Sequence, residues 1–316
     1  MGHRHGLPQL EGGFFLTDGG IETTLIFHQG LDLPAFAAFV LLADEDGTNE
    51  LRRYYAPYVE LARDLGLGLV LESPTWRASP RWAAELGYTE AELDALNRKG
   101  IALMEELREE LGPSGGPVVI SGCVGPHDDG YSPATKLTAD AAQKYHSTQI
   151  ATFGGTAADM VTAITMTYVN EAVGLARAAG AAGVPVVISF TVETDGRLPT
   201  GQGLGEAITE VDEETGGAPA YYMINCAHPT HFADVLDGEP WQARIGGLRA
   251  NASTKSHAEL DEATELDEGD PVDFGARHAE LRERLPRLNV VGGCCGTDHR
   301  HVTETCRAWL AGGATR

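Results

Sequence analysis

The chain has 316 residues, 42% of them hydrophobic, and its 23 basic and 46 acidic residues give a net charge of -23. The length suits one large α/β domain with a sizeable core, and the negative charge argues against binding to nucleic acid or to anionic membranes. No apolar run approaches the roughly 18 residues of a membrane-spanning helix, and the N-terminus lacks the apolar stretch of a secretory signal. We therefore expect a cytoplasmic protein, and a homo-oligomer stays open.

Short apolar, β-branched runs alternate with amphipathic stretches along almost the whole chain. Continuous apolar runs are typical of parallel strands that are covered on both faces. The predicted strands cover residues 14–16, 67–71, 118–120, 160–164, 186–190, 221–224, 245–248 and 289–291.

The segments between these runs have the periodicity of helices. Apolar residues recur every three or four positions from Leu51 to Leu65, which predicts a helix that has Thr48 or Asn49 as its N-cap and ends at Gly66. Similar patterns cover residues 89–111, 138–157, 170–182 and 299–311. Strand–helix alternation repeated in this way favours a (β/α)8 TIM barrel, formed by a single domain over residues 1–316, although an open doubly wound sheet stays the alternative.

Two segments interrupt this alternation. Residues 258–273 carry eight acidic residues and no basic one, so we predict a solvated acidic insertion at about 252–273, after the seventh strand. Residues 194–204 are rich in turn-forming residues and are predicted to form a loop after the fifth strand.

The five cysteines are too few, and odd in number, for a disulfide framework. Cys294 and Cys295 directly follow the last predicted strand, and Cys226 directly follows the sixth. In a barrel, these strand ends share the face where active sites gather, so the three thiols form a candidate Zn²⁺ site with an open fourth position. Cys123 ends the third strand and is predicted to line the same mouth, whereas Cys306 lies in a helical pattern and is predicted to pack.

Other interpretations of these residues stay open. A single cysteine at a strand end is most often a small buried side chain, and the Cys294–Cys295 pair also fits a redox switch. His228, His299 or His301 can replace one thiol as a ligand, although such histidines are commonly polar loop residues.

The cysteine motifs resemble those of the homocysteine S-methyltransferase family. The resemblance rests on Gly-Gly-Cys-Cys-Gly at 292–296 and on Asn225-Cys226 about seventy residues upstream. Residues 18–25, which begin Asp-Gly-Gly, and segments 72–79 and 121–126 are similar to the family's motifs after the first three strands. The similarity extends over about residues 11–310. The family includes enzymes that depend on S-methylmethionine or betaine and the homocysteine module of cobalamin-dependent methionine synthase.

The resemblance implies a barrel that holds zinc through Cys226, Cys294 and Cys295, with the sulfur of homocysteine at the open position. That sulfur then attacks an activated methyl group, which gives methionine. Because an alkyl thiol has a pKa of about 8.5, binding to the metal supplies the thiolate at neutral pH. Asn225, beside a ligand, is expected to support the metal site from outside its ligand set.

The first motif supplies the candidate cradle for the amino acid substrate. Asp18 with the amides of Gly19 and Gly20 is expected to hold the ammonium and carboxylate groups, although a simple Asp-Gly-Gly turn explains the same residues. Glu22 is either an acid near the mouth or a solvated acid at a helix start. Trp76 is expected to hold a cationic methyl donor by cation–π attraction, or else simply to pack.

One departure from the family concerns the ammonium group. Relatives commonly carry a Glu-Thr pair after the fourth strand, where the glutamate helps to hold the ammonium of homocysteine. Here residues 164–167 read Ile-Thr-Met-Thr, without an acid, and Glu171 and Glu193 are the candidate substitutes.

The sequence thus predicts a zinc-dependent methyltransferase that acts on homocysteine. The chain leaves no room for folate- and cobalamin-binding modules, which favours a small diffusible donor such as S-methylmethionine, S-adenosylmethionine or a betaine-like compound. The alternatives are a barrel lyase or hydrolase with zinc as Lewis acid, which would favour histidine and carboxylate ligands, and a non-catalytic zinc or redox thiol module.

Overall fold

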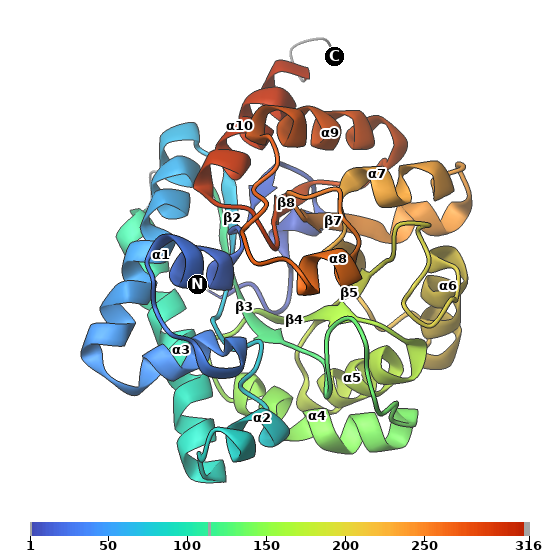
Figure 1. Ribbon diagram of the computed structural model, residues 1–316. Coiled ribbons are helices and arrows are strands. Elements are labelled where there is room, and N and C mark those ends of the chain that lie inside the picture. The colour runs from blue at the N-terminus through green and yellow to red at the C-terminus, as the bar shows by residue number, and fades with distance from the viewer. Residues whose placement is uncertain (1, 113–114, 313–316) are drawn as a thin grey trace.

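The computed structural model describes residues 2–112 and 115–312 and shows a closed barrel of eight parallel strands in sequential order (Figure 1). The strands are β1 (Phe15–Leu16), β2 (Gly68–Glu72), β3 (Val118–Val124), β4 (Met160–Met166), β5 (Val186–Thr191), β6 (Tyr221–Asn225), β7 (Ile245–Ala250) and β8 (Val290–Gly293). Pairing of β1 with β8 closes the barrel. The predicted TIM barrel and its eight strands are confirmed, and the open sheet is excluded.

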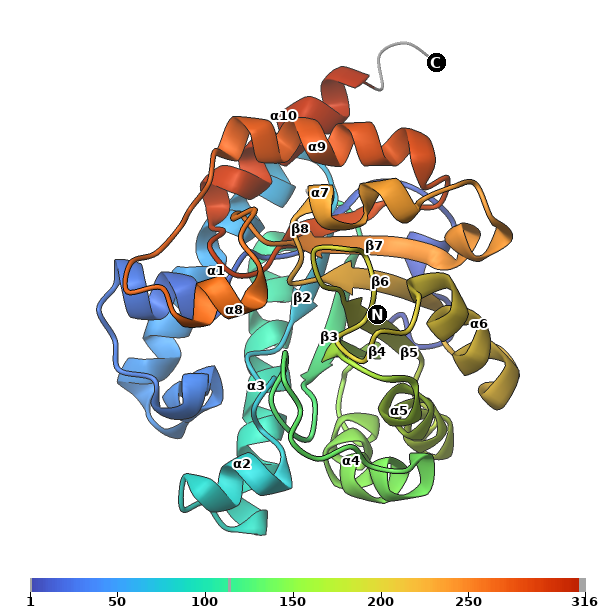
Figure 2. The same cartoon turned by 45° about the vertical axis from the view of Figure 1, so that its right-hand side comes forward.

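Helices surround the barrel on its outside, and α9 and α10 lie side by side on one flank (Figures 1 and 2). The α-helices are α1 (Glu45–Leu65), α2 (Pro80–Glu85), α3 (Glu90–Leu111), α4 (Ala139–Gly154), α5 (Val169–Ala182), α6 (Leu204–Thr215), α7 (Pro229–Phe232), α8 (His257–Asp261), α9 (Pro271–Arg284) and α10 (His299–Gly312). In the part of the chain that the structure describes, none of the helices is both long and apolar enough to cross a membrane.

The interior of the barrel has an apolar layer below a polar one. The lower layer is a separate cluster of buried side chains: Leu7, Phe15, Val70, Val119, Met160, Val187, Tyr221, Met223 and Val290. Because side chains alternate along a strand, the inward positions of the next layer lie two residues further on. That layer contains Glu72, Ser121, Thr162, Ser189 and Arg249, all buried. The polar layer therefore lies at the carboxyl ends of the strands, next to the predicted site.

The first long helix begins earlier than predicted. Asp44, rather than Thr48 or Asn49, is the N-cap of α1, and its carboxylate accepts a hydrogen bond of 2.8 Å from the amide of Gly47. The first turn of α1 is polar, so apolar periodicity could not reveal it. The predicted end is confirmed, because Gly66 adopts the left-handed conformation that terminates the helix.

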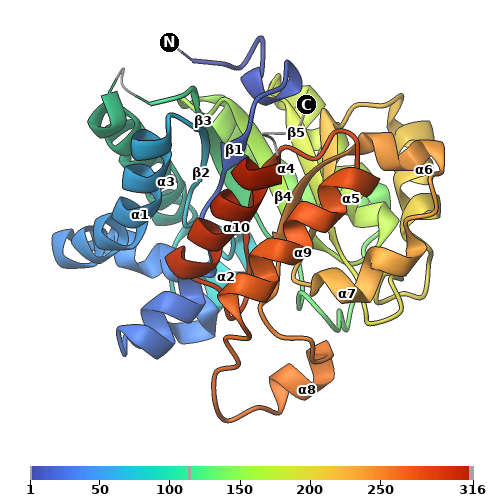
Figure 3. The ribbon, with the colours of Figure 1, turned by 90° about the horizontal axis from the view of Figure 1, so that it is seen from above.

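The acidic segment lies between β7 and α9 and contains the short helix α8. Figure 3 shows α8 projecting from the end of the barrel opposite to the N-terminal segment. Most of its acids are exposed, but Asp267 accepts a hydrogen bond of 2.8 Å from Ser253 and an ion pair of 3.2 Å from Lys255. The segment is thus fastened to the loop that follows β7.

Candidate metal centre and substrate site

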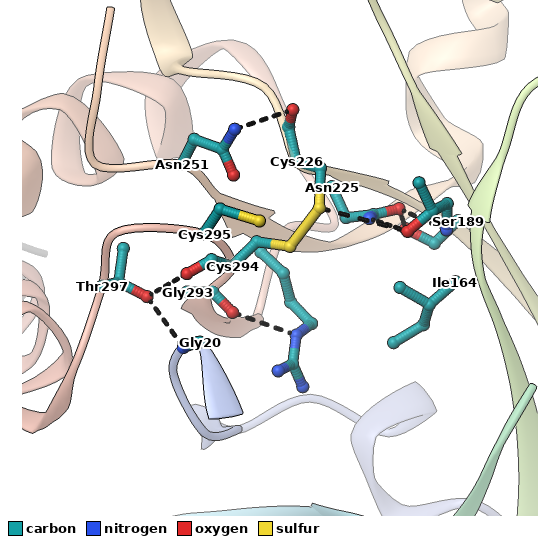
Figure 4. Close-up of a disulfide and its surroundings, with 12 residues drawn as sticks. Gly20, Ile164, Ser189, Asn225, Cys226, Asn251, Gly293, Cys294, Cys295 and Thr297 are labelled. Atoms are coloured by element: carbon teal, nitrogen blue, oxygen red, sulfur yellow. Dashed lines mark hydrogen bonds between the residues drawn. A yellow bond between two sulfur atoms is a disulfide. The ribbon is translucent and has the colours of Figure 1, made fainter. Parts of the chain in front are cut away.

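Three cysteine sulfurs converge at the carboxyl ends of β6 and β8. The sulfur atoms of Cys226, Cys294 and Cys295 all lie within 4.8 Å of one another, a group that can hold a metal ion. Cys226 and Cys294 are joined as a disulfide in the structure, and the Cys295 sulfur points toward the same spot (Figure 4). Reduction of this disulfide would present three thiolates to one ion.

The loop after β8 holds two of these sulfurs by backbone hydrogen bonds. The amide of Cys294 donates to the carbonyl of Ala250 at 2.8 Å, and the carbonyl of Cys295 accepts from Ala252 at 3.1 Å. The hydroxyl of Thr297 donates to the Cys294 carbonyl at 2.7 Å (Figure 4). The loop is therefore fixed against β7 before any metal binds.

Cys226 is held by groups from two other segments. Its carbonyl accepts hydrogen bonds from the side-chain nitrogen of Asn251 at 3.0 Å and from Nε2 of His257 at 2.6 Å. Nδ1 of His257 lies 3.2 Å from the carboxylate of Glu193. Glu193 therefore orients a group that supports Cys226.

Asn225 ties three strands together directly beside Cys226. Its side-chain oxygen accepts from the amide of Thr165 at 2.9 Å and from the hydroxyl of Ser189 at 2.6 Å, and its nitrogen donates to the hydroxyl of Thr165 at 2.9 Å (Figure 4). Asn225 is fully buried. These contacts suit a residue that positions Cys226, as expected for support from outside a ligand set.

Two stacked aromatic side chains lie beside the cysteine cluster, in which Cys295 is exposed. The ring of Tyr131, from the loop after β3, stacks on His257 with a centroid separation of 4.0 Å. The hydroxyl of Tyr131 lies 3.3 Å from the sulfur of Cys295. Sequence reasoning missed both residues, because nothing in the local sequence around either one indicates a contact with the cysteines.

Asp18 lies at the mouth but already has a cation. Its carboxylate accepts from Nη1 of Arg249 at 2.6 Å and from the hydroxyl of Tyr54 at 2.8 Å. Arg249 also donates to the carbonyls of Gly19 and Gly293 at 3.0 and 3.2 Å, so it links the Asp-Gly-Gly turn to the cysteine loop. Sequence reasoning did not single out Arg249, although a charged residue within an otherwise apolar strand is unusual.

The two glycines of the expected cradle differ in their contacts. The amide of Gly20 donates to the carbonyl and hydroxyl oxygens of Thr297 at 3.0 and 3.1 Å. It therefore already has partners within the protein, and a role of Gly20 in binding the substrate carboxylate stays a prediction. The backbone of Gly19 passes close to Asp298, because a Cβ added to Gly19 would lie 3.1 Å from the Cα of Asp298. A role of Gly19 in substrate binding also stays a prediction.

Trp76 has the contacts of a packed side chain. Its indole nitrogen donates to the carbonyl of Ile164 at 3.2 Å, and the guanidinium of Arg77 lies 4.2 Å from its ring centroid. The cation that lies over the indole ring in the structure is therefore the side chain of Arg77. A contact of Trp76 with the donor stays a prediction.

The other candidate ligands lie elsewhere. Cys306 is buried in the layer between the barrel and the helices, and Cys123 is buried on β3. His228 caps α7, and His301 contacts Asp298 and the carbonyl of Glu268. Among the described residues, the group that contains the three sulfurs includes no histidine.

A second group of possible ligands is formed by His28, Glu268 and Asp298, whose ligand atoms lie within 4.8 Å of one another. Arg300 bonds to both carboxylates, at 2.5 Å to Glu268 and 2.7 Å to Asp298. Because one guanidinium already bonds to both acids, the group is explained as an ion-pair network that fastens the acidic segment to α10.

Comparisons with known proteins identify the family and the fold. The family model of homocysteine S-methyltransferases matches residues 15–309, whereas a comparison with curated proteins gives no match. The solved homocysteine methyltransferase MmuM from Escherichia coli is similar in fold. Its metallated form has a TM-score of 0.69 and 18% identity over 95% of this chain and 98% of that chain. Its oxidized form has a TM-score of 0.70 and 21% identity over 94% and 97%. Since the family match spans nearly the whole chain, this protein is a methyltransferase of the homocysteine S-methyltransferase family.

Proposed function

We propose that this chain is a zinc-dependent enzyme that moves a methyl group from a small diffusible donor to the thiol of homocysteine, giving methionine. The observation that carries the proposal is the convergence of Cys226, Cys294 and Cys295 at the mouth of the barrel. Three protein ligands are typical of catalytic zinc, because they leave one tetrahedral position open, and cysteine thiolates are among the ligands that zinc prefers. A lyase or hydrolase that uses zinc as Lewis acid would favour histidine or carboxylate ligands, which this group lacks among the described residues.

Zinc at this site would keep the acceptor sulfur ionised near neutral pH, where a free alkyl thiol with a pKa of about 8.5 is mostly protonated. Asn225, Asn251 and His257 hold the Cys226 segment rigid, and Arg249 fixes the Asp18 turn beside the cysteine loop. These contacts fix the positions of the groups that would hold the acceptor, and alignment of the two reactants accelerates such a reaction.

We infer that the donor carries its methyl group on a positively charged atom, as S-methylmethionine, S-adenosylmethionine and betaine do. The acceptor thiol loses its proton to solvent, and its sulfur forms the new bond to the methyl carbon. The bond from that carbon to the onium atom breaks, and its electron pair stays with the neutral leaving group. Tyr131 and His257 lie beside the sulfurs and would form one wall of the site where the reactants meet.

The test is a panel of the three donors, assayed with homocysteine on reduced protein that is either zinc-loaded or treated with a chelator. We expect methionine from zinc-loaded protein alone. Cys226→Ala, Cys294→Ala and Cys295→Ala should each lose most of the bound zinc, whereas Cys306→Ala, which changes a packing residue, should keep it. Equal zinc loss in Cys306→Ala, or full activity after chelation, would contradict the proposal.

A further inference from the structure

Glu22 is an acid at the barrel mouth with no assigned function. It directly precedes the irregular helix over Thr23–His28. Both of its flanks are tied to the cysteine loop, because the amide of Gly20 donates to Thr297 and the hydroxyl of Thr23 accepts from the amide of Gly296 at 3.0 Å. Glu22 is therefore held beside the sulfur atoms by the same contacts that hold the loop.

The carboxylate of Glu22 has no partner side chain among the described residues, although it is partly buried. Burial raises the pKa of Glu22 to about 7, and the negative charge of Asp18 adds to the increase, whereas a backbone hydrogen bond and attraction to Arg249 and Arg77 only partly oppose it. Desolvation is the main cause of the raised pKa of the Cys123 and Cys295 thiols, and the charge of Glu22 adds to both. Since these thiols lie on β3 and after β8, Glu22 lies close enough to both strand ends for its charge to act on them.

Three other acids near the site are engaged by basic side chains. Asp18 is paired with Arg249 at 2.6 Å. Glu171, one of the candidate substitutes for the missing acid after β4, accepts from the amide of His127 at 2.6 Å and contacts His146 at 2.9 Å. Glu193, the other candidate, contacts His257. Glu22, in contrast, forms no ion pair or side-chain hydrogen bond among the described residues, so its carboxylate can receive a cation that enters the mouth.

We propose that Glu22 binds the α-ammonium group of homocysteine, an inference that rests on the proposed function. A buried or half-buried carboxylate without a partner is costly, and an incoming ammonium removes that cost through a charge-assisted hydrogen bond. In homocysteine, a short carbon chain separates the sulfur from the ammonium. An acceptor whose sulfur lies at the cysteines thus brings its ammonium into the region that Glu22 faces.

The test compares homocysteine with γ-mercaptobutyrate, which has the same thiol and carboxylate but lacks the ammonium. Glu22→Gln keeps the shape of the side chain and removes its charge, and Glu60→Gln on the exposed face of α1 is the matched control. We expect Glu22→Gln to lower kcat/KM for homocysteine by about 10- to 100-fold, through KM, and to leave γ-mercaptobutyrate nearly unchanged. Zinc content and the KM of the donor should not move, and Glu22→Asp should restore part of the preference.

Calorimetry gives a readout that does not depend on turnover. Methionine should bind the zinc-loaded wild type more tightly than its des-amino analogue, and this preference should disappear in Glu22→Gln. Equal losses for both acceptors, an unchanged preference, or an effect on donor KM alone would overturn the assignment of Glu22. In contrast, a wild type that methylates no thiol acceptor would refute the proposed function itself, so the two failures are distinguishable.

Discussion

Glu72 makes the stability of this protein depend on pH in a direction that can be measured. It ends β2 inside the barrel and is 4% exposed. Burial raises its pKa from 4.5 to about 7, and attraction to Arg249 and hydrogen bonds from Ser121 and Thr162 only partly oppose the shift. Between these two pH values the folded protein keeps a proton that the unfolded chain has released. The free energy of unfolding therefore falls as the pH rises through this window.

The size of the effect follows from the shift. A shift from 4.5 to about 7 corresponds to about 3 kcal/mol, since one pKa unit is worth about 1.4 kcal/mol. Glu72→Gln has the same shape and does not ionise, so it removes this loss. We expect the variant to match the wild type near pH 4 and to exceed its free energy of unfolding by up to about 3 kcal/mol at pH 8.

Urea unfolding of reduced, metal-free protein at a series of pH values measures this difference. Glu60→Gln, on the exposed surface of α1, controls for the loss of one negative charge and should leave the pH dependence of the wild type unchanged. Because the pKa of Glu22 is also raised to about 7, the free energy of unfolding of the Glu72→Gln variant should keep a residual pH dependence. A variant that is no more stable than the wild type at pH 8 would refute the reasoning.

Two further predictions concern the cysteine loop. Desolvation raises the pKa of Cys295, and the hydrogen bond from the hydroxyl of Tyr131 lowers it. Tyr131→Phe should therefore move the pH profile of Cys295 alkylation in reduced, metal-free protein upward by about 0.5–1 unit. Peptide mass spectrometry measures the alkylation, and an unchanged profile would exclude this hydrogen bond. Gly20→Ala would bring a Cβ to 2.5 Å from the Cys294 carbonyl oxygen and should abolish stoichiometric zinc binding. Gly180→Ala, whose added Cβ would have no atom within 4 Å, should bind zinc as the wild type does. Equal zinc contents in the two variants would show that the loop can move aside.

The strands and the meeting of the cysteines were predictable for the same reason. Strands buried on both faces are continuous apolar runs, so each left a clear pattern in the sequence. Once a barrel is assumed, the residues after β6 and β8 must share one rim, which brings Cys226 to Cys294 and Cys295. The prediction that these cysteines meet therefore depended on the strand order of the barrel and not on any local sequence pattern.

The contacts that complete the site could not be predicted in this way. Arg249 pairs with Asp18, 231 positions away in the chain, and Tyr131 reaches Cys295 across 164 positions. Such pairs depend on side-chain direction within a packed mouth, and strand order does not determine that direction. The occupation of the Gly20 amide by Thr297 was missed for the same reason, because a turn motif shows which donors exist and not which acceptors lie opposite them.

The backbone at Cys226 shows how strain serves the site. Asn225 points into the barrel, so an extended continuation of β6 would direct Cys226 outward, away from the other two sulfurs. Instead Cys226 has a φ of 52°, a left-handed conformation that costs about 1–2 kcal/mol in a non-glycine residue and rotates the side chain toward the mouth. Asn251 and His257 hold its carbonyl, and Asn225 likewise holds Thr165, whose φ is 68°. The buried amides therefore maintain the strained backbone on which the convergence of the three sulfurs depends.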